Sequence, residues 1–220
     1  MRQTDPRVRR GARIPVRRGF GSFIAGLSLL LVVMSSTTGS AADEAAVKTQ
    51  LATFGGGCFW CLDAAFKTFT GVKAVTSGYC GGAVANPTYQ QVCTGATGHA
   101  EVVQIEFEPA KISYDQLLEI FWDVHDPTSM NRQGADEGTQ YRSVIFYHDE
   151  AQKQAAEKSK LAAAKRFKSP IVTEIVALKP FYPAEDYHQD YFHKHPNVPY
   201  CAYVIQPKLE KLRKAKHAAE

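Results

Sequence analysis

Apolar residues recur at strand and helix spacings along most of the chain after residue 50. Alternating or short continuous apolar runs predict strands at residues 51–54, 72–79, 101–107, 143–147 and 171–178. Helical spacing covers residues 62–69, 114–125 and 150–167, and Ser113 is the expected N-cap of the second helix. This order of elements predicts an α+β fold, a two-layer sandwich with helices packed on a mostly antiparallel sheet.

The strand at residues 101–107 carries one charged residue on its apolar face. Val103, Ile105 and Phe107 lie on one side of this strand, and Glu101 shares that side. Because burial disfavours the charged form of a carboxyl group, we expect a raised pKa and a proton on Glu101 near neutral pH. A carboxylate at a strand end that reaches solvent is the alternative.

Two segments lack a regular apolar pattern. Residues 83–98 are rich in Gly, Thr, Pro and Asn and are expected to form a long loop, a kind of segment that is often functional. The C-terminal part is rich in Pro, Tyr and His. Its basic tail at residues 208–216 is expected to be a solvated helix face.

The first 42 residues have the composition of an export signal. They contain seven arginines and one acid, with an apolar run at residues 20–34 and small residues at 35–42. This segment has a formal charge of +6 against +4 for the whole chain, so the remainder is at −2 and nucleic acid is not an expected partner. The apolar run is short for a spanning helix, so no stable membrane insertion is expected after cleavage. An uncleaved anchor is the alternative.

The chain is therefore expected to consist of an export signal peptide at residues 1–42 and one folded domain at residues 43–220. Small residues at 40–42 fit a cleavage site, and residues 17–20 resemble a twin-arginine signal. The general secretory route is the alternative. Either route predicts an exported protein, with the bacterial periplasm as the expected location.

Five cysteines follow the leader: Cys58, Cys61, Cys80, Cys93 and Cys201. An odd number in an exported chain indicates a free or cycling thiol rather than a scaffold of disulfides alone. Zinc is not expected, because Cys58-x-x-Cys61 has no second pair at zinc-finger spacing. Cys80 and Cys93 are expected to be bystanders, and a structural disulfide is the alternative.

Cys58 lies where a predicted strand and three glycines lead into a helix, in the run Gly-Gly-Gly-Cys-Phe-Trp at residues 55–60. Unpaired N–H groups and the helix dipole favour negative charge at a helix start, so we expect a lowered pKa and a reactive thiolate at Cys58. Phe59 and Trp60 supply an apolar surface beside it. A tight turn with a buried, inert cysteine is the alternative.

This run resembles the active-site signature of the A-type peptide methionine sulfoxide reductases, which reduce methionine-S-sulfoxide. The resemblance continues through Gly-Tyr-Cys-Gly-Gly at residues 78–82, Asn-Pro-Thr-Tyr at 86–89, Gly-His-Ala-Glu at 98–101, His-Asp-Pro at 125–127, Gly-Thr-Gln-Tyr-Arg-Ser at 138–143, Phe-Tyr-Pro-Ala-Glu-Asp-Tyr-His at 181–188 and Pro-Tyr-Cys at 199–201. It covers nearly all of residues 53–207. It implies a ferredoxin-like plait, a catalytic domain at residues 43–220, and reduction of methionine sulfoxide, free or in proteins, to methionine.

The resemblance also assigns roles. Cys58 corresponds to the nucleophile that attacks the sulfoxide sulfur, becomes a sulfenic acid and releases methionine. A sulfoxide sulfur is a poor electrophile until its oxygen is protonated, so such a site needs an acid and O–H donors. The expected substrate-binding residues are Phe59 and Trp60 for the S-methyl group, Glu101, Tyr89 and Tyr141 for the sulfoxide oxygen, and Asp136 and, as a less close match, Tyr200 in the same pocket.

A sulfenic acid at Cys58 condenses with a second thiol to give a disulfide. Cys201 matches the family's C-terminal resolving position and is the leading candidate, in a Pro-flanked segment expected to be mobile. Cys61 replaces the glycine of the commonest family pattern and lies one helical turn from Cys58, so it is the second candidate. An external dithiol, such as a thioredoxin-like protein, is then needed to reduce the disulfide, and no bound metal, flavin or nucleotide is implied.

Two other functions fit parts of the sequence. A thioredoxin-like dithiol oxidoreductase also begins with strand, Cys-x-x-Cys and helix, and it would require both Cys58 and Cys61. An exported module that binds peptides through aromatic residues would not require the Cys58 thiol.

Overall fold

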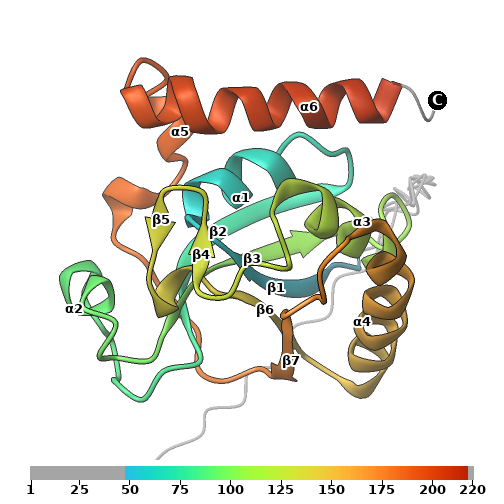
Figure 1. Cartoon of the computed structure of the whole chain (residues 1–220), viewed down its shortest axis with the longest axis horizontal. Helices are drawn as coiled ribbons and strands as arrows, with labels where there is room; N and C mark the ends of the chain where they lie inside the picture. The colour runs from blue at the N-terminus through green and yellow to red at the C-terminus, as the bar shows by residue number, and fades with distance from the viewer. Residues whose placement is uncertain (1–47, 218–220) are drawn as a thin grey trace, which may run out of the picture. The chain divides into compact units, whose positions relative to one another are not determined.

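The computed structural model describes residues 48–217, and the helices and strands of this part are shown in Figure 1. The export signal predicted at residues 1–42 lies outside the described residues. Within residues 48–217, helices are too short or too polar to cross a membrane.

A six-stranded sheet forms the centre of the described part, with the strand order β7-β6-β1-β3-β2-β8. Its strands are β1 (Gln50–Gly56), β2 (Val72–Cys80), β3 (Ala100–Phe107), β6 (Ser143–Tyr147), β7 (Glu174–Ala177) and β8 (Tyr182–Pro183). The four inner strands β6-β1-β3-β2 are antiparallel to one another, whereas β7 pairs with β6 in parallel at the edge of the sheet. A separate two-stranded hairpin consists of β4 (Arg132–Gln133) and β5 (Asp136–Glu137).

Two helices connect the inner strands in the order β1-α1-β2 and β3-α3-β6. This connectivity and strand order are those of the ferredoxin-like plait, so the predicted α+β sandwich is confirmed. The helices are α1 (Phe59–Phe66), α2 (Tyr89–Cys93), α3 (Tyr114–Val124), α4 (Glu150–Ala163), α5 (Tyr191–Lys194) and α6 (Gln206–His217).

The main core lies between the sheet and helices α1 and α3. Phe54 of β1 packs against Phe66 of α1 and Phe121 of α3, with ring centroids 5.7 and 5.1 Å apart. Ser113 caps α3 as predicted, because its side chain accepts from the backbone N–H of Gln116. Burying this apolar stripe fixes α1 on the sheet, and with it the position of Cys58.

Three local predictions were wrong. The predicted loop at residues 83–98 contains the short helix α2, which begins with a capping box between Thr88 and Gln91. The strand predicted at residues 171–178 is limited to β7, because only these residues pair with β6. Helix α1 ends at Phe66, before the apolar Phe69 that extended the predicted helix.

The C-terminal helix α6 follows a π-helical turn at Cys201–Ile205 and lies above α1 in the view of Figure 1. Leu209 and Leu212 of α6 are buried in the main core cluster. The basic tail is therefore helical, as predicted. One side of this helix packs against the domain, so the prediction of a fully solvated helix face was wrong on that side.

Candidate functional site

Cys58 lies at the N-cap of α1, and Gly57 alone separates it from the end of β1. In the β1–β3 register, Phe54 pairs with Val103, so the chain that leaves β1 passes the end of β3 where Glu101 lies. Cys58 is 8% exposed and Glu101 is 1% exposed. The sheet thus brings together the predicted nucleophile and the predicted acid, which are far apart in the sequence.

Gly57 allows the tight turn that places Cys58. Its φ is +96°, a conformation that residues with a side chain rarely adopt. A Cβ atom at this position would lie 2.7 Å from Cγ and 2.8 Å from Cβ of Gln133 on β4. The hairpin β4–β5 therefore packs directly against the turn that precedes the nucleophile.

The carboxyl group of Glu101 lies at the N-terminus of α1. Its Oε2 accepts a 3.1 Å hydrogen bond from the backbone N–H of Phe59, the first residue of the helix. Burial raises the pKa of Glu101 to about 8, with smaller contributions from the charges of Asp136 and Cys61, and the Phe59 N–H only partly opposes this effect. The predicted neutral acid is therefore supported, since Glu101 keeps its proton at neutral pH.

The predicted lowering of the Cys58 pKa was wrong. Burial, a hydrogen bond from Cys58 to Cys61 and the nearby Glu101 together raise the pKa of Cys58 well above its ordinary value. The backbone N–H of Trp60 lowers it, as expected at a helix start, but cannot compensate. The first N–H of the helix, that of Phe59, is bonded to Glu101 instead.

Cys61 has the lowered pKa that was predicted for Cys58. The hydrogen bond from Cys58 is the largest cause; burial opposes it, and Lys208 and Tyr200 contribute further, so that the pKa of Cys61 falls to about 7. Its Sγ is 3.8 Å from the Tyr200 hydroxyl and 3.8 Å from Nζ of Lys208. Of the two thiols, Cys61 therefore loses its proton more readily, and Cys58 keeps its proton at neutral pH.

Phe59 and Trp60 belong to an aromatic group centred on His188. The His188 ring centroid lies 5.0 Å from that of Phe59, 5.6 Å from that of Trp60 and 4.4 Å from that of Tyr89. The indole N–H of Trp60 donates to Nδ1 of His188 at 3.2 Å, and the Trp60 ring stacks on Tyr191 at 3.7 Å. These contacts fix the orientation of the Trp60 ring.

Nε2 of His188 is buried and has no hydrogen-bond partner among the described residues. Since Nδ1 accepts from Trp60, Nε2 carries the hydrogen atom, and burial lowers the pKa of the ring. His188 therefore holds the Trp60 ring in place and leaves an unpaired N–H donor within the aromatic group, as far as the described residues show.

Tyr89 and Tyr141 both lie near Glu101. Burial raises the pKa of each tyrosine, and the charge of Glu101 raises both further; Cys58 also contributes for Tyr141. Tyr89 is held by Glu185, whose carboxylate accepts from the backbone N–H of Tyr89 and from the Tyr79 hydroxyl, each at 2.9 Å. Two O–H groups therefore remain protonated beside the acid, as the prediction requires.

Asp136 and Tyr200 are joined directly. The Tyr200 hydroxyl donates to Oδ2 of Asp136 at 2.6 Å, which ties the C-terminal segment to the hairpin β4–β5. Cys201, next to Tyr200, is 0% exposed and forms part of the main core cluster. The mobile segment predicted around Cys201 is thus a packed π-helical turn in this structure.

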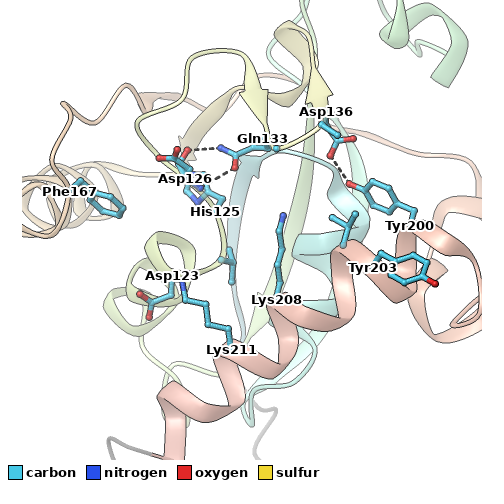
Figure 2. Close-up of a pocket in the computed structure, with 14 residues that line it drawn as sticks. Asp123, His125, Asp126, Gln133, Asp136, Phe167, Tyr200, Tyr203, Lys208 and Lys211 are labelled. Atoms are coloured by element: carbon cyan, nitrogen blue, oxygen red, sulfur yellow. Dashed lines mark hydrogen bonds between the residues drawn. The ribbon is translucent and has the colours of Figure 1, made fainter.

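A cavity of about 630 Å³ opens beside these residues (Figure 2). Its walls come from the end of α3, the hairpin β4–β5 and helix α6, and they include Asp136, Tyr200 and Lys208. Figure 2 shows Lys208 extending from α6 toward the hairpin side of the cavity.

Three residues of the site were missed by the sequence interpretation. Glu185 and His188 lie within the string at residues 181–188, so the resemblance marked the segment but gave them no role. Lys208 lies in the basic tail, and nothing in its spacing indicates the contact with Cys61, 147 positions earlier.

All five cysteines are free thiols, and Cys80 and Cys93 make their contacts outside the Cys58–Cys61 pair. Cys80 is buried, and its Sγ donates to the backbone carbonyl of Lys179. Cys93 is exposed on α2, where it is hydrogen-bonded to Tyr89. Among residues 48–217, no group of three His, Cys, Asp or Glu side chains is arranged to hold a metal ion.

Comparison with known proteins gives one consistent family. The family model described as peptide methionine sulfoxide reductase matches residues 50–220. The chain is 57% identical over 166 residues to the peptide methionine sulfoxide reductase MsrA of Nautilia profundicola, covering 76% of this chain and 95% of that protein. It is 55% identical over 165 residues to the MsrA of Sulfolobus acidocaldarius, covering 75% and 94%.

Solved structures agree with this result. Mxr1 from Saccharomyces cerevisiae in its reduced form is similar with a TM-score of 0.67 and 35% identity, over 70% of this chain and 90% of that one. Methionine sulfoxide reductase A of Corynebacterium diphtheriae is similar with a TM-score of 0.62 and 38% identity, over 69% and 78% of the two chains.

Proposed function

Since this chain belongs to the peptide methionine sulfoxide reductase family, we propose that it reduces methionine-S-sulfoxide, free or in proteins, by attack of Cys58 on the sulfoxide sulfur. The chain is an oxidoreductase that acts on methionine sulfoxide. One observation carries the detailed mechanism: Cys58 lies beside Glu101, a buried acid that keeps its proton at neutral pH.

The first step transfers oxygen from the substrate to Cys58. Glu101 protonates the sulfoxide oxygen, which makes the sulfur electrophilic, while the Cys58 proton passes to the Cys61 sulfur to which it is hydrogen-bonded. Cys58 sulfur then bonds to the substrate sulfur. As the oxygen moves to Cys58, the S–O bond of the substrate and the new S–S bond both break. Cys58 supplies the two electrons that reduce the substrate, so methionine leaves and Cys58 becomes a sulfenic acid.

The aromatic group orients the substrate in this proposal. Phe59 and Trp60 hold the S-methyl group, supported by the contacts that fix the Trp60 ring. Tyr89 and Tyr141 donate hydrogen bonds to the sulfoxide oxygen, supported by their positions near Glu101. Asp136 and Tyr200 close the pocket on the side of the Cys61 thiol.

Cys61 is the first resolving thiol in this mechanism. It lies one helical turn from Cys58, is hydrogen-bonded to it, and has a pKa of about 7, near the optimum for an attacking thiol at neutral pH. Cys201 was the leading candidate from the resemblance, but its thiol is buried and burial raises its pKa. In a second exchange Cys201 attacks the Cys61 sulfur, so that a Cys61–Cys201 bond forms, the Cys58–Cys61 bond breaks and the Cys58 thiol is released. The Cys61 and Cys201 thiols are close enough for their charges to interact.

An external dithiol completes the cycle. The resting enzyme must regain two thiols, and each turnover consumes two electrons, so we assign this step to a thioredoxin-like protein that attacks the disulfide. The chemistry of the site uses thiols, an acid and tyrosines, and the proposed cycle has no step for a bound metal, flavin or nucleotide.

The mechanism is tested by mixing reduced protein with a peptide that contains methionine-S-sulfoxide in a single turnover, followed by mass spectrometry of peptide and protein. The unmodified chain, Cys61→Ser and Cys201→Ser are expected to remove one oxygen from the peptide, and Cys58→Ser is not. Cys61→Ser should accumulate sulfenic acid at Cys58. Exposed Cys93→Ser is the matched control and should behave as the unmodified chain.

Two results would contradict the proposal. Oxygen removal by Cys58→Ser would exclude Cys58 as nucleophile, and a stalled sulfenic acid in Cys201→Ser but not in Cys61→Ser would make Cys201 the first resolver. The R epimer of the same peptide should remain oxidised, which tests the proposed stereochemistry.

Export to the periplasm remains part of the proposal. It rests on the arginine-rich start, apolar run and small residues of positions 1–42. N-terminal sequencing of protein from separated cell fractions tests it. Mature protein that begins near residue 43 in the periplasmic fraction is expected, whereas full-length protein in the cytoplasmic fraction would contradict export.

A further inference from the structure

Of the two thiols in the Cys58–Cys61 pair, that of Cys61 contacts a cation, and that of Cys58 contacts none within residues 48–217. Nζ of Lys208 lies 3.8 Å from Cys61 Sγ, and the Tyr200 hydroxyl lies at the same distance. We propose that Lys208 is a positioning residue that stabilises the thiolate form of Cys61 and thereby directs the negative charge of the pair away from Cys58. The functional consequence rests on the proposed role of Cys61 as resolving thiol, whereas the charge state itself can be measured without it.

The location of Lys208 suits this role. Helix α6 lies above α1 in the view of Figure 1, and Lys208 extends from α6 into the cavity in Figure 2. The side chain is half-buried, so its charge is less screened than that of a surface lysine. Among the residues that the structure describes, Lys208 has no carboxylate within salt-bridge distance, so its ammonium group is not neutralised by another partner.

Lys211 provides a natural comparison on the same helix. It lines the same cavity but is exposed, and in the view of Figure 2 it runs toward the side where Asp123 lies. A substitution at Lys211 removes the same formal charge from the same helix. The difference between the two lysines therefore isolates the contact with Cys61 from the general charge of α6.

Other groups around Cys61 either raise or lower its pKa. The hydrogen bond from Cys58 lowers its pKa, burial raises it, Lys208 and Tyr200 lower it, and the charge of Asp136 raises it. Glu101 and Cys201 also lie close enough to interact with the Cys61 charge. The titratable groups that face Cys61 are thus Cys58 from the start of α1, Glu101 from β3, Asp136 from β5, Tyr200 and Cys201 from the C-terminal segment, and Lys208 from α6. Lys208 is the cation of this set, so its removal leaves no positive charge to oppose the effect of Asp136 on the Cys61 pKa.

A stabilised Cys61 thiolate affects the second chemical step. The thiolate attacks the sulfur of the Cys58 sulfenic acid, an S–S bond forms, the S–O bond breaks, and the oxygen leaves as water after taking up a proton. A thiol that ionises near neutral pH attacks at useful rates and also leaves easily when an external dithiol reduces the disulfide. Lys208 therefore favours both formation and later reduction of the Cys58–Cys61 disulfide.

The pH dependence of alkylation tests the inference directly. Reduced full-length protein is treated with iodoacetamide over a range of pH, and fragment ions in mass spectrometry distinguish Cys61 from Cys58. Lys208→Met, which keeps an unbranched side chain of similar bulk and removes the charge, should move the midpoint of Cys61 alkylation upward by about one pH unit or more, equivalent to a roughly tenfold smaller thiolate fraction at low pH. Lys208→Arg should restore the original midpoint, and Lys211→Met should leave it unchanged.

An unchanged midpoint in Lys208→Met, or an equal shift in Lys211→Met, would overturn the inference. Far-UV circular dichroism checks that the variants are folded, and Lys208→Gln serves if Lys208→Met is not. Single-turnover reactions of the same proteins separate this outcome from the proposed function. Absence of methionine formation in the unmodified chain would reject the proposed function, whereas the alkylation midpoints would still decide the role of Lys208.

Discussion

The backbone N–H of Phe59 donates a 3.1 Å hydrogen bond to the carboxyl group of Glu101, at the first turn of helix α1. A helix start is commonly used to stabilise an anion, and here the nucleophile Cys58 and the acid Glu101 compete for the same N–H groups. The buried acid takes the first of these donors but still has a raised pKa. The site therefore holds a protonated acid and a protonated Cys58 before substrate binds.

Glu101 should control the alkaline limit of the reaction. A proton donor with a pKa of about 8 is present below that pH and is lost as the pH rises through it. Single-turnover methionine formation should therefore fall above about pH 8. Glu101→Gln should slow it on the order of a hundred- to ten-thousandfold and remove this pH dependence. Glu106→Gln, on the same strand but partly exposed, is the control; equal loss in both variants would argue against a specific role.

Glu101 should also lower stability at alkaline pH. The folded protein holds this proton up to about pH 8, whereas the unfolded chain releases it at the ordinary pKa of a carboxyl group. The folded state then binds more protons than the unfolded state, so this group's contribution to stability decreases between those two pH values. Thermal unfolding followed across this range should show Glu101→Gln gaining several degrees over the unmodified chain toward pH 8. A constant difference at all pH values would contradict this.

His188→Ala should release the Trp60 ring. The variant removes the acceptor of the indole N–H and a ring that contacts Phe59 and Tyr89. We expect a several-fold higher KM for methionine sulfoxide with a smaller change in kcat, because substrate positioning is lost while Cys58 and Glu101 remain. In a Trp122→Phe background, Trp60 is the single tryptophan, and its emission should shift to the red. His193→Ala, at an exposed histidine of α5, should change neither value.

Gly57→Ala should destabilise the domain more than Gly134→Ala. Both glycines have a positive φ, +96° and +62°, so both substitutions cost roughly 1–2 kcal/mol of backbone strain. Only the Cβ atom at residue 57 meets a neighbour, Gln133, whereas nothing lies within 4 Å at residue 134. Urea unfolding should show an additional loss of roughly 1–3 kcal/mol for Gly57→Ala. Equal losses would mean that Gln133 moves aside without cost.

Much of the domain follows from local patterns in the sequence. The antiparallel strands and helices α3 and α4 were predicted because each buries one face, and burial of one face imposes a regular spacing on apolar residues. The raised pKa of Glu101 was predicted for the same reason, since its position in the alternation of β3 fixed the side on which it lies. Helix α2 was missed because its five residues are too few to show a period.

The sequence by itself thus determined most strands and helices and the burial of Glu101, because these depend on residues close together along the chain. It indicated the sulfur chemistry through the family motifs spread over residues 53–207. The tertiary structure decided which thiol carries the negative charge, how Trp60 is held and where Cys201 lies. Lys208 contacts Cys61 across 147 positions, and His188 binds Trp60 across 128. A pKa depends on burial and on distances to such remote groups, and these distances exist only after the chain has folded.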